Sequence, residues 1–453
     1  MRTNRRKILR VALLLLLGCL VLLGFDLSNS ASVSFSKTSS TALSNTMKPS
    51  YLKPVVSGKP FIGSKTIQSG TSTTTTQVAG SSVTESPTTQ GSPASTTTQV
   101  PSPSTSTTVS SPVVSHEPMK DLGIQPATLT QSQWDVLLNI AQSAGAKVIS
   151  FDLNWASYEP NGPAPSGEWT NLDSFVSDVR SRGLLIRIQI VGMPDWARSP
   201  GEPSFASAPW LAPSTPGELQ AWSQFVTRLA SHFGNEVAYY EIWNEENEST
   251  FFSQGPNPSI YANILESSYV AIRSATSVPQ VMFGGTSRND IGFVSQVYSA
   301  IDAQFPATAI SDHHFFDILG VHPYSGDRAP SAVLSSWVYQ DQWGTMDENY
   351  TGFEELHALM AQQGEGYKHI YISEFGYNTV PWNGFSAVSD STRATYLTEA
   401  FNLAAQSGYV DGLCWYYFYP TPWNPSSWTL LQGSGPSWQQ TATFTALENV
   451  PNS

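Results

Sequence analysis

The segment YYEIWNEENEST, Tyr239–Thr250, joins large apolar and aromatic residues directly to a cluster of acids. No Gly or Pro separates the two parts, although a carboxylate is costly to bury unless it is paired or hydrogen-bonded. The pattern fits a strand that ends in acids at the mouth of a ligand site. It also fits a strand that simply leaves the core into solvent. The rest of the sequence decides between these two interpretations.

Strand-like apolar segments recur along the chain from about Pro118, and an amphipathic helical segment follows each of them. Strands are expected over residues 121–124, 147–153, 184–191, 237–243, 281–285, 316–322, 369–373 and 410–419. Helices are expected over residues 132–144, 172–182, 216–233, 260–275, 293–301, 354–363, 391–406 and 438–447. Several of these helical segments stop at a Gly, which suits the left-handed C-terminal cap of a helix.

Repeats of strand and helix in this number are typical of a (β/α)8 barrel, which contains from about 200 to over 400 residues. An open, doubly wound sheet is the alternative. Such a sheet usually carries a Gly-rich phosphate-binding turn after its first strand, and this sequence has none there. The sequence therefore predicts an α/β protein whose body is a (β/α)8 TIM barrel.

The composition limits the kinds of partner that the protein can bind. Charged residues make up only 13% of the 453 residues, and the formal net charge is −13. Phosphate binding needs a face lined with Lys and Arg, so we expect no nucleic-acid partner. Aromatic residues are frequent, with 14 Trp, and their rings stack well on flat ligands. Cys19 and Cys414 are the two cysteines, and we expect no disulfide framework.

The N-terminus is predicted to carry an export signal. Basic residues between Arg2 and Arg10 precede an apolar run from Val11 to Phe25, which at 15 residues is short for a membrane-spanning helix. We expect residues 1–30 to be a signal peptide or an uncleaved signal anchor. Either alternative places the body outside the cell or at its surface, with the membrane contacted only through residues 11–25.

Residues 31–115 are rich in Ser, Thr and Pro, with runs such as TSTTTTQ and SPSTSTT. Such a segment cannot bury enough apolar area to offset its chain entropy. It is therefore predicted to be a disordered stalk that holds the body away from the cell envelope. The body is then expected to span residues 116–453.

The active site of a barrel lies on the loops at the C-terminal ends of its strands. Six predicted strands leave into acids or aromatic residues at this end, at positions 152–155, 192–196, 243–245, 322–324, 373–376 and 415–417. A plain exit into solvent would not need these aromatic rings, so the opening segment is better explained by a ligand site. Trp155 and Trp196 are expected to stack on the ligand.

Two acids occupy positions suited to bond cleavage. Glu245 lies just after the fourth predicted strand and Glu374 just after the seventh, and these strands lie across a barrel from each other. Paired carboxylates can cleave a glycosidic bond, because one protonates the leaving oxygen while the other attacks the anomeric carbon or activates water. We therefore expect an oligo- or polysaccharide substrate, with no metal and no cofactor. The adjacent His313 and His314 point apart and match no metal-binding pattern.

At these residues the chain resembles glycoside hydrolase clan A, the barrel glycosidases with catalytic glutamates on strands four and seven. The resemblance rests on the motifs EIWNEEN, GVHPY, YISEFGY and CWYYF in that order, and it points most to the β-xylosidase-type family 39. It implies a retaining hydrolase in which Glu245 is the general acid/base and Glu374 the nucleophile. It also implies a set of substrate-binding residues: Asn244 at the 2-hydroxyl of the sugar, His322 and Tyr324 beside the nucleophile and sugar, and Trp415 at the floor of the subsite.

The resemblance also implies an ionised Glu374, held at a low pKa by donors such as Tyr324. Many clan members carry an Arg on strand two beneath the nucleophile, whereas residues 148–150 contain none here. Either Arg187 on strand three substitutes for it or that contact is missing. Among the remaining acids, Glu241 is expected inside the barrel. Glu246, like Glu248, is expected on the rim.

Two other functions would require many of the same residues. A non-catalytic, carbohydrate-binding barrel would keep the aromatic residues but lose one carboxylate, and this chain has both Glu245 and Glu374. A transglycosylase would use the same two glutamates and differ from a hydrolase only in the acceptor. The paired acids therefore favour an enzyme.

Overall fold

The computed structural model describes residues 116–164, 169–421, 426–435 and 437–452. The expected signal segment, residues 1–30, and the expected stalk, residues 31–115, lie outside these ranges. Within the described ranges, no helix combines the length and apolar character needed to cross a membrane.

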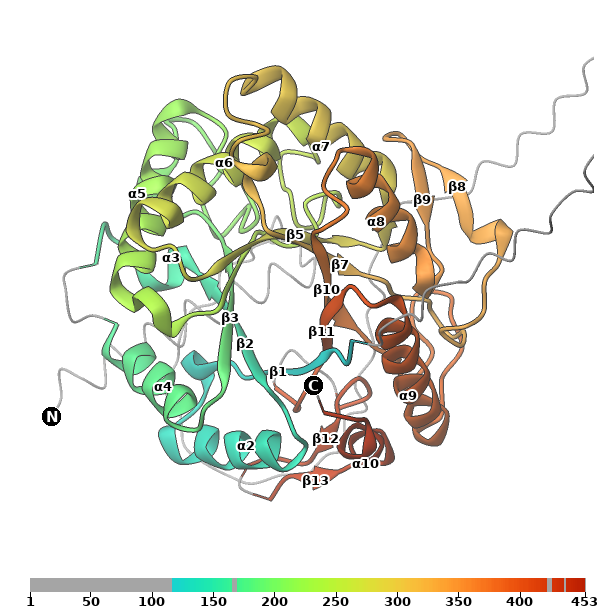
Figure 1. Cartoon of the computed structure of the whole chain (residues 1–453). Coiled ribbons are helices and arrows are strands. Elements are labelled where there is room, and N and C mark those ends of the chain that lie inside the picture. Colours follow the sequence, from blue (N-terminus) through green and yellow to red (C-terminus); the bar gives the residue numbers. More distant parts are fainter. Residues whose placement is uncertain (1–115, 165–168, 422–425, 436, 453) are drawn as a thin grey trace, which may run out of the picture. The chain divides into compact units, whose positions relative to one another are not determined.

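Eight parallel strands close into a barrel, and helices surround it (Figure 1). Around the barrel the strands follow their order in the sequence, and the last strand pairs with the first. This arrangement confirms the predicted (β/α)8 fold. The barrel strands are β1 (Met119–Gly123), β2 (Val148–Asn154), β3 (Leu185–Val191), β4 (Tyr239–Ile242), β5 (Gln280–Ser287), β7 (Ile318–His322), β10 (His369–Phe375) and β11 (Val410–Trp415).

The helices cover the outside of the barrel and bury their apolar faces against it. They are α2 (Gln131–Ser143), α3 (Trp155–Tyr158), α4 (Thr170–Ser181), α5 (Pro216–Phe233), α6 (Pro258–Ala275), α7 (Ile291–Gln304), α8 (Phe353–Gln362), α9 (Asp390–Ser407) and α10 (Ala442–Asn449). Local sequence signals set their ends. A capping box of Thr215 and Glu218 starts α5, and Gly408 ends α9 with a φ of 77°.

The structure corrects the C-terminal elements of the prediction. The last barrel strand ends at Trp415 rather than at residue 419, and the last helix begins at Ala442 rather than at residue 438. Thr441 caps this helix, because its side chain accepts a hydrogen bond from the Phe444 N–H. Two small sheets were not predicted: β6 (Asn289–Asp290) with β9 (Thr345–Asp347) and β8 (Val338–Gln340), and β12 (Leu431–Gln432) with β13 (Gln439–Gln440).

A charged cluster fills the inside of the barrel. Arg187 of β3 pairs with Asp121 of β1, at 2.7 Å from Nε, and with Glu241 of β4. The same guanidinium donates to the Ser373 carbonyl of β10 at 3.3 Å. These side chains are almost completely withdrawn from water, where a charge is tolerated only with a partner. The expected position of Glu241 inside the barrel is confirmed, and the cluster joins four strands.

The loop after β4 is held in place by the end of β5. The Glu245 N–H donates to the Gly285 carbonyl at 3.0 Å, and the Asn247 side chain accepts from the Ser287 N–H at 2.9 Å. Trp243 and Glu245 have φ values of 74° and 42°, in a region that costs non-glycine residues free energy. The hydrogen bonds to β5 offset this cost and fix the direction in which the Glu245 side chain leaves the strand.

Glu246 does not lie on the rim, so the prediction for this residue is wrong. Its side chain is fully buried against Gly284 of β5, and among the described residues neither carboxylate oxygen has a hydrogen-bond partner. Burial raises the pKa of Glu246 to about 8. The clustering of acids in the sequence suggested solvation, whereas the loop turns this one residue inward. Glu248 is only partly buried and lies 3.6 Å from Arg288, as expected of a rim residue.

Replacing Glu246 by Gln should change how stability depends on pH. The folded-state pKa of about 8 exceeds the ordinary value of 4.5, so the folded wild type holds its proton longer than the unfolded chain. Wild type should therefore lose stability relative to Glu246→Gln as the pH rises from about 5 to about 8, by up to about 1.4 kcal/mol per pH unit. Urea unfolding of both proteins across this range measures the difference. Parallel pH dependences would contradict a buried, protonated Glu246.

Candidate active site

Glu245 and Glu374 converge on one buried histidine. Glu245 follows β4, Glu374 lies in β10, and His322 is the last residue of β7. His322 Nδ1 lies 3.1 Å from Glu245 Oε1 and 3.7 Å from Glu374 Oε2. One oxygen of each carboxylate and a ring nitrogen of the histidine all lie within 4.8 Å of one another. The glutamate side chains are 13% and 21% exposed while His322 is fully buried, so a ligand can reach the acids but not the imidazole.

A chain of hydrogen bonds below His322 determines where its protons lie. The Ser373 hydroxyl donates to Glu241 Oε1 at 2.7 Å, so it must accept from His322 Nε2, which lies 3.2 Å away. Nε2 therefore carries a proton, and Nδ1 faces the two outer carboxylates. Burial by itself lowers the pKa of His322, but Glu374 and Glu245 raise it, and the result is a pKa of about 9. At neutral pH the imidazolium is thus a donor to the acid pair.

The pKa of Glu374 does not follow the expected direction. The Tyr324 hydroxyl donates to Glu374 Oε2 at 2.8 Å, so the expected donor is in place. Burial nevertheless raises the pKa of Glu374 to about 7, because this effect and the nearby Glu245 outweigh the lowering by His322 and Tyr324. Glu374 therefore gains or loses its proton near neutral pH. The prediction of a low pKa overlooked how far the carboxylate is withdrawn from water.

Gly285 of β5 makes room for the buried histidine. A Cβ atom at this position would lie 2.1 Å from His322 Nε2 and 2.8 Å from Ser373 Oγ, which no side chain could tolerate without displacing them. Gly285, the second Gly of VMFGG, is thus required by packing, because the His322 side chain of the neighbouring strand β7 lies where its Cβ atom would be.

Two further predicted residues lie beside the acid pair, or directly below it. Asn244 is buried, and its Oδ1 accepts a hydrogen bond from Gln189 Nε2 at 3.2 Å. Its amide is therefore oriented from the strand beside it. Arg187 lies below Glu374, where it contacts the backbone carbonyl of the preceding residue, Ser373. Among the described residues Arg187 has no hydrogen bond or ion pair with the Glu374 side chain, so it does not replace the strand-two Arg as a direct partner of this carboxylate.

The predicted stacking residue Trp155 lies in the core. It is fully buried and stacks on Phe225 of α5 at 5.0 Å, and its Nε1 donates to Glu159. Trp155 starts the short helix α3, which turns this side chain toward the helix layer and away from the strand ends. Trp196, by contrast, is 37% exposed, and its Nε1 donates to the Glu159 carbonyl. Of these two, only Trp196 offers a face to a ligand.

Trp415 also differs from its expected role as the floor of a subsite. It is only 2% exposed, and its Nε1 donates to the Trp428 carbonyl at 2.9 Å. Trp415 therefore supports the segment that carries Trp428. Trp428 packs edge to face on Tyr324 at 6.1 Å and on Trp382 at 5.4 Å. Since Tyr324 is bonded to Glu374, an aromatic wall leads from the acid pair to Trp382, which is 47% exposed.

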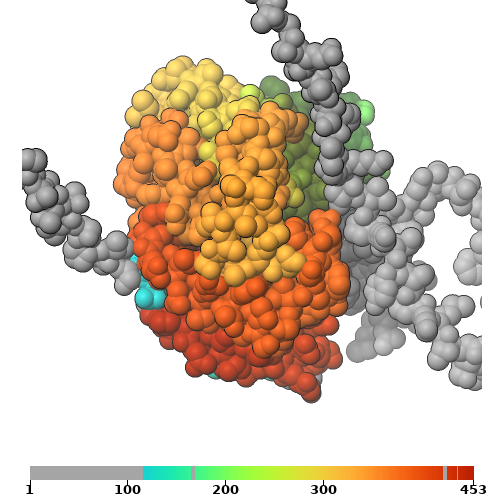
Figure 2. Space-filling model, turned by 90° about the vertical axis from the view of Figure 1, so that its right-hand side faces the viewer, coloured from blue at the N-terminus to red at the C-terminus, as the bar shows by residue number. Residues whose placement is uncertain are grey.

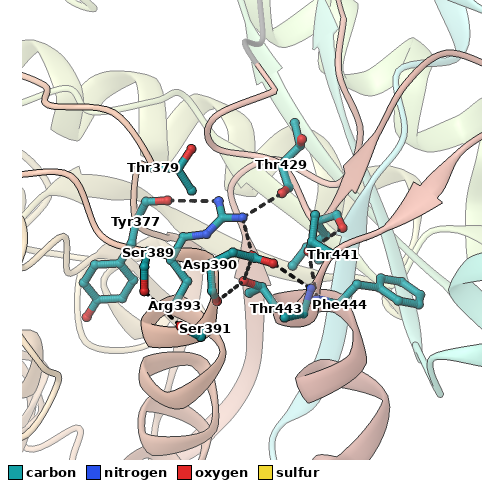
Figure 3. Close-up of polar contacts among 12 residues, drawn as sticks. Tyr377, Thr379, Ser389, Asp390, Ser391, Arg393, Thr429, Thr441, Thr443 and Phe444 are labelled. Atoms are coloured by element: carbon teal, nitrogen blue, oxygen red, sulfur yellow. Dashed lines mark hydrogen bonds and ion pairs between the residues drawn. The ribbon is translucent and has the colours of Figure 1, made fainter.

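Arg393 of α9 secures the segment that carries Trp428 (Figure 3). The side chain is fully buried and donates to the backbone carbonyls of Ser427, at 3.0 Å, and Thr429, at 3.4 Å. It also pairs with Asp390 at 2.7 Å. The helix thus holds the chain on both sides of Trp428. Sequence reasoning missed this residue, because an Arg in an amphipathic helix is normally assigned to the solvent face.

Asp152 of β2 is a third acid at the C-terminal ends of the strands. Gln125 Nε2 donates to its Oδ2 at 2.8 Å. The side chain is accessible to solvent, yet the surrounding protein displaces enough water to raise the pKa of Asp152 to about 6. Its charge also contributes to raising the pKa of Glu374. In the sequence, only the position of Asp152 at the end of the second predicted strand indicated that it would lie near the site.

The two histidines of Ser311–Asp317 have different partners. His313 Nδ1 lies 2.8 Å from the Tyr367 hydroxyl, whereas His314 Nδ1 lies 2.9 Å from Glu365 Oε1. They point apart, as the sequence predicted. The three side chains Glu245, His322 and Glu374 do have the spacing of a metal-ligand set, but the same contacts are accounted for by protons shared between two acids and an imidazole.

No family model and no curated protein matches this chain. Solved structures do match its fold. A family 39 glycoside hydrolase from the gut symbiont Bacteroides cellulosilyticus superposes with a TM-score of 0.55 at 19% identity, over 74% of this chain and 63% of that one. This chain therefore spans less than two thirds of the length of that structure.

Two other solved structures are also similar in fold. A monomeric β-xylosidase from Caulobacter crescentus gives a TM-score of 0.52 at 14% identity, over 74% of this chain and 69% of that one. A GH39 enzyme from Xanthomonas axonopodis gives 0.51 at 15% identity, over 74% and 67%. At these identities the likeness concerns the fold. The barrel of this chain thus has the fold of barrel glycoside hydrolases, as its sequence motifs predicted.

Proposed function

We propose that this protein is a retaining glycoside hydrolase that cleaves O-glycosidic bonds of an oligo- or polysaccharide. The observation that carries the proposal is the pair Glu245 and Glu374, whose nearest oxygens lie within 4.8 Å at the C-terminal ends of β4 and β10. Retaining enzymes hold their carboxylates about 5–5.5 Å apart, whereas inverting enzymes need about 6.5–9.5 Å to admit a water. The closeness of the nearest oxygens is compatible with the retaining arrangement, and double displacement is the mechanism that we propose.

The first chemical step would form a covalent intermediate. Glu374, as an ionised carboxylate, attacks the anomeric carbon while the glycosidic C–O bond breaks, and Glu245 gives its proton to the leaving oxygen. In the second step Glu245, now ionised, takes a proton from water, whose oxygen displaces Glu374 from the anomeric carbon. Each carboxylate returns to its starting state. A transglycosylase would differ only by placing a sugar hydroxyl where the water stands.

The surroundings of the two acids support this division of roles. Glu374 accepts a hydrogen bond from the Tyr324 hydroxyl, which favours the ionised form that a nucleophile requires, whereas the His322 imidazolium lies near both acids and does not distinguish them. Glu245 sits on a loop rather than within a strand, where it can approach a leaving group from the side. Asn244 is oriented by Gln189 and leaves its amide nitrogen available to a sugar hydroxyl.

An extended substrate is supported by the aromatic wall of Tyr324, Trp428 and Trp382. Tyr324 touches the proposed nucleophile, while Trp382 is the exposed end of the wall. A single sugar at the acids would leave this outer ring unused. Aromatic faces in such a row can stack on successive sugar rings, so the wall suits a chain of several sugars.

Variants of the two glutamates should behave differently. Glu374→Ala should abolish turnover of every glycoside, because no covalent intermediate can form. Glu245→Ala should lose about 10²–10⁴-fold in kcat with natural leaving groups, the usual worth of general acid catalysis. It should spare the first step with dinitrophenyl glycosides, whose leaving group needs no proton. Steady-state and burst kinetics with both substrate types measure these effects.

Azide provides an independent check on the same roles. It should rescue Glu245→Ala with a product of retained configuration, since the small anion attacks the intermediate without a base. With Glu374→Ala, azide would enter from the opposite face and give an inverted product, which NMR distinguishes. Glu248→Gln, at a nearby rim acid, serves as the matched control and should remain close to wild type. Equal slowing of both substrate types by Glu245→Ala, with no azide effect, would refute the assignment.

The pH profile should report the ionisation of Glu374. With a pKa of about 7, the nucleophile is ionised above this pH, so kcat/KM should fall as the pH decreases below about 7. Tyr324→Phe removes a hydrogen bond that lowers the pKa of Glu374, and the acid limb should therefore move to higher pH. An acid limb that stays in place in Tyr324→Phe would show that another group controls it.

Trp382→Ala should separate long substrates from short ones. Loss of the outer ring should raise KM for oligosaccharides by about tenfold, which corresponds to about 1.4 kcal/mol, and leave aryl monoglycosides unaffected. Tyr367→Ala removes a comparably exposed ring at the opposite end of the barrel and is the matched control. The same rise in KM with monoglycosides would indicate a folding defect. An unchanged KM with both substrate types would show that the aromatic wall is not part of the substrate site.

A further inference from the structure

A second cluster of titratable side chains lies at the opposite end of the barrel from the acid pair. His116 precedes β1, His369 is the first residue of β10, and Asp411 is the second residue of β11. These three strands are neighbours in the barrel, in the order β1, β11, β10. Figure 2 agrees with this arrangement, since the first described residues, in cyan, lie beside the orange and red surface of the later elements.

The two imidazoles are directed at the same carboxylate oxygen. His369 Nδ1 lies 2.5 Å and His116 Nε2 lies 3.3 Å from Asp411 Oδ1. One ligand atom from each of the three side chains lies within 4.8 Å of the other two. In a tetrahedral zinc site, bond lengths of about 2.0–2.2 Å put neighbouring ligand atoms about 3.3 Å apart. Only small side-chain movements would thus bring the three atoms around one ion.

The backbone supports this position of His116. Its N–H donates to the Ala405 carbonyl of α9 at 3.3 Å, so the residue is attached to the barrel by main chain as well as side chain. His116 and His369 pack edge to face with ring centres 5.8 Å apart. Both rings are partly exposed, and an ion could therefore reach them from solvent without any opening of the barrel.

No Lys or Arg within the described ranges pairs with Asp411, whose ion-pair partners are the two histidines. Nearby cations have other acids as partners. Lys368 lies 2.7 Å from Glu365, and Arg273 pairs with Asp317. The Asp411 carboxylate is therefore available to a metal cation, which the two imidazoles could bind at the same time.

Space for additional ligands lies next to the cluster. A cavity of about 430 Å³ is lined by His369 and Asp411, together with other residues at the N-terminal ends of β5 and β7 such as Gln280 and Ile318. It could admit the water that completes a coordination shell with three protein ligands. The acid pair Glu245 and Glu374 is not part of this cavity.

We propose that His116, His369 and Asp411 form a binding site for a divalent transition-metal ion of the zinc type. Two imidazoles and one carboxylate suit zinc and its neighbours, whereas Mg²⁺ and Ca²⁺ prefer oxygen ligands. The ion would join the start of the described chain to β10 and β11 and so stabilise the N-terminal end of the barrel. The site is independent of the proposed glycosidase chemistry.

The test is a zinc titration of the full-length chain after removal of metal with EDTA and dialysis. Calorimetry should find one tight equivalent of Zn²⁺ per chain, and Zn²⁺ should raise Tm, whereas Mg²⁺ should do neither. His116→Ala and His369→Ala each remove one of three ligands, so each should weaken the binding at least about tenfold. Since the His116 side chain is 46% exposed, its variant should fold normally, which the Tm without metal verifies.

Two control variants separate this site from the alternatives. His232→Ala breaks a similar His–Asp pair, with Asp173 at 2.5 Å, that has no third ligand within the described part of the chain, and zinc binding should remain as in wild type. Glu245→Gln alters the other set of three metal-like ligands, and binding should again be unchanged. Zinc binding that is lost in Glu245→Gln, or kept in both His116→Ala and His369→Ala, would overturn the proposal, as would the absence of any binding.

Discussion

The ion pairs of Arg187 inside the barrel are the constraint on which the candidate site depends. This guanidinium lies between Asp121 and Glu241, and none of the three has access to bulk water. Removing Arg187 would leave two buried carboxylates without their cation, and breaking a buried ion pair in this way typically costs about 3–5 kcal/mol. The cluster also spans β1, β3 and β4 and contacts β10 through Ser373. It therefore sets the relative positions of the strands from which Glu245 and Glu374 extend.

A continuous chain of polar contacts leads from this cluster to the acid pair. Glu241 accepts from Ser373, Ser373 accepts from His322, and His322 faces Glu245 and Glu374. The Ser373 hydroxyl donates to Glu241 and so must accept from His322 Nε2, while the imidazolium donates through Nδ1 toward the acid pair. The charge on Arg187 thus fixes the orientation of His322 indirectly. The barrel interior and the proposed chemistry are consequently one electrostatic unit.

Two other features protect this arrangement. Gly285 leaves the space that the His322 ring occupies, and the hydrogen bond from the Glu245 N–H to the Gly285 carbonyl holds the loop in its uncommon backbone conformation. On the opposite side, Arg393 anchors the segment of Trp428 from α9. The acids are therefore supported from the strand below and the aromatic wall from the helix layer. Rigid support of this kind keeps catalytic groups within the small tolerances that chemistry requires.

The amino-acid sequence by itself determined the (β/α)8 fold, since the alternation of apolar strands with capped amphipathic helices is a local property. It also determined that Glu245, Glu374, His322 and Tyr324 would meet, because residues at the C-terminal ends of parallel barrel strands share one rim. Only the tertiary structure decided which side chains face that rim. Glu246 and Trp155 follow strands just as their neighbours do, but a loop conformation and a short helix turn them into the core. Likewise the raised pKa of Glu374 results from burial and from acids distant in the sequence, and such effects depend on three-dimensional packing.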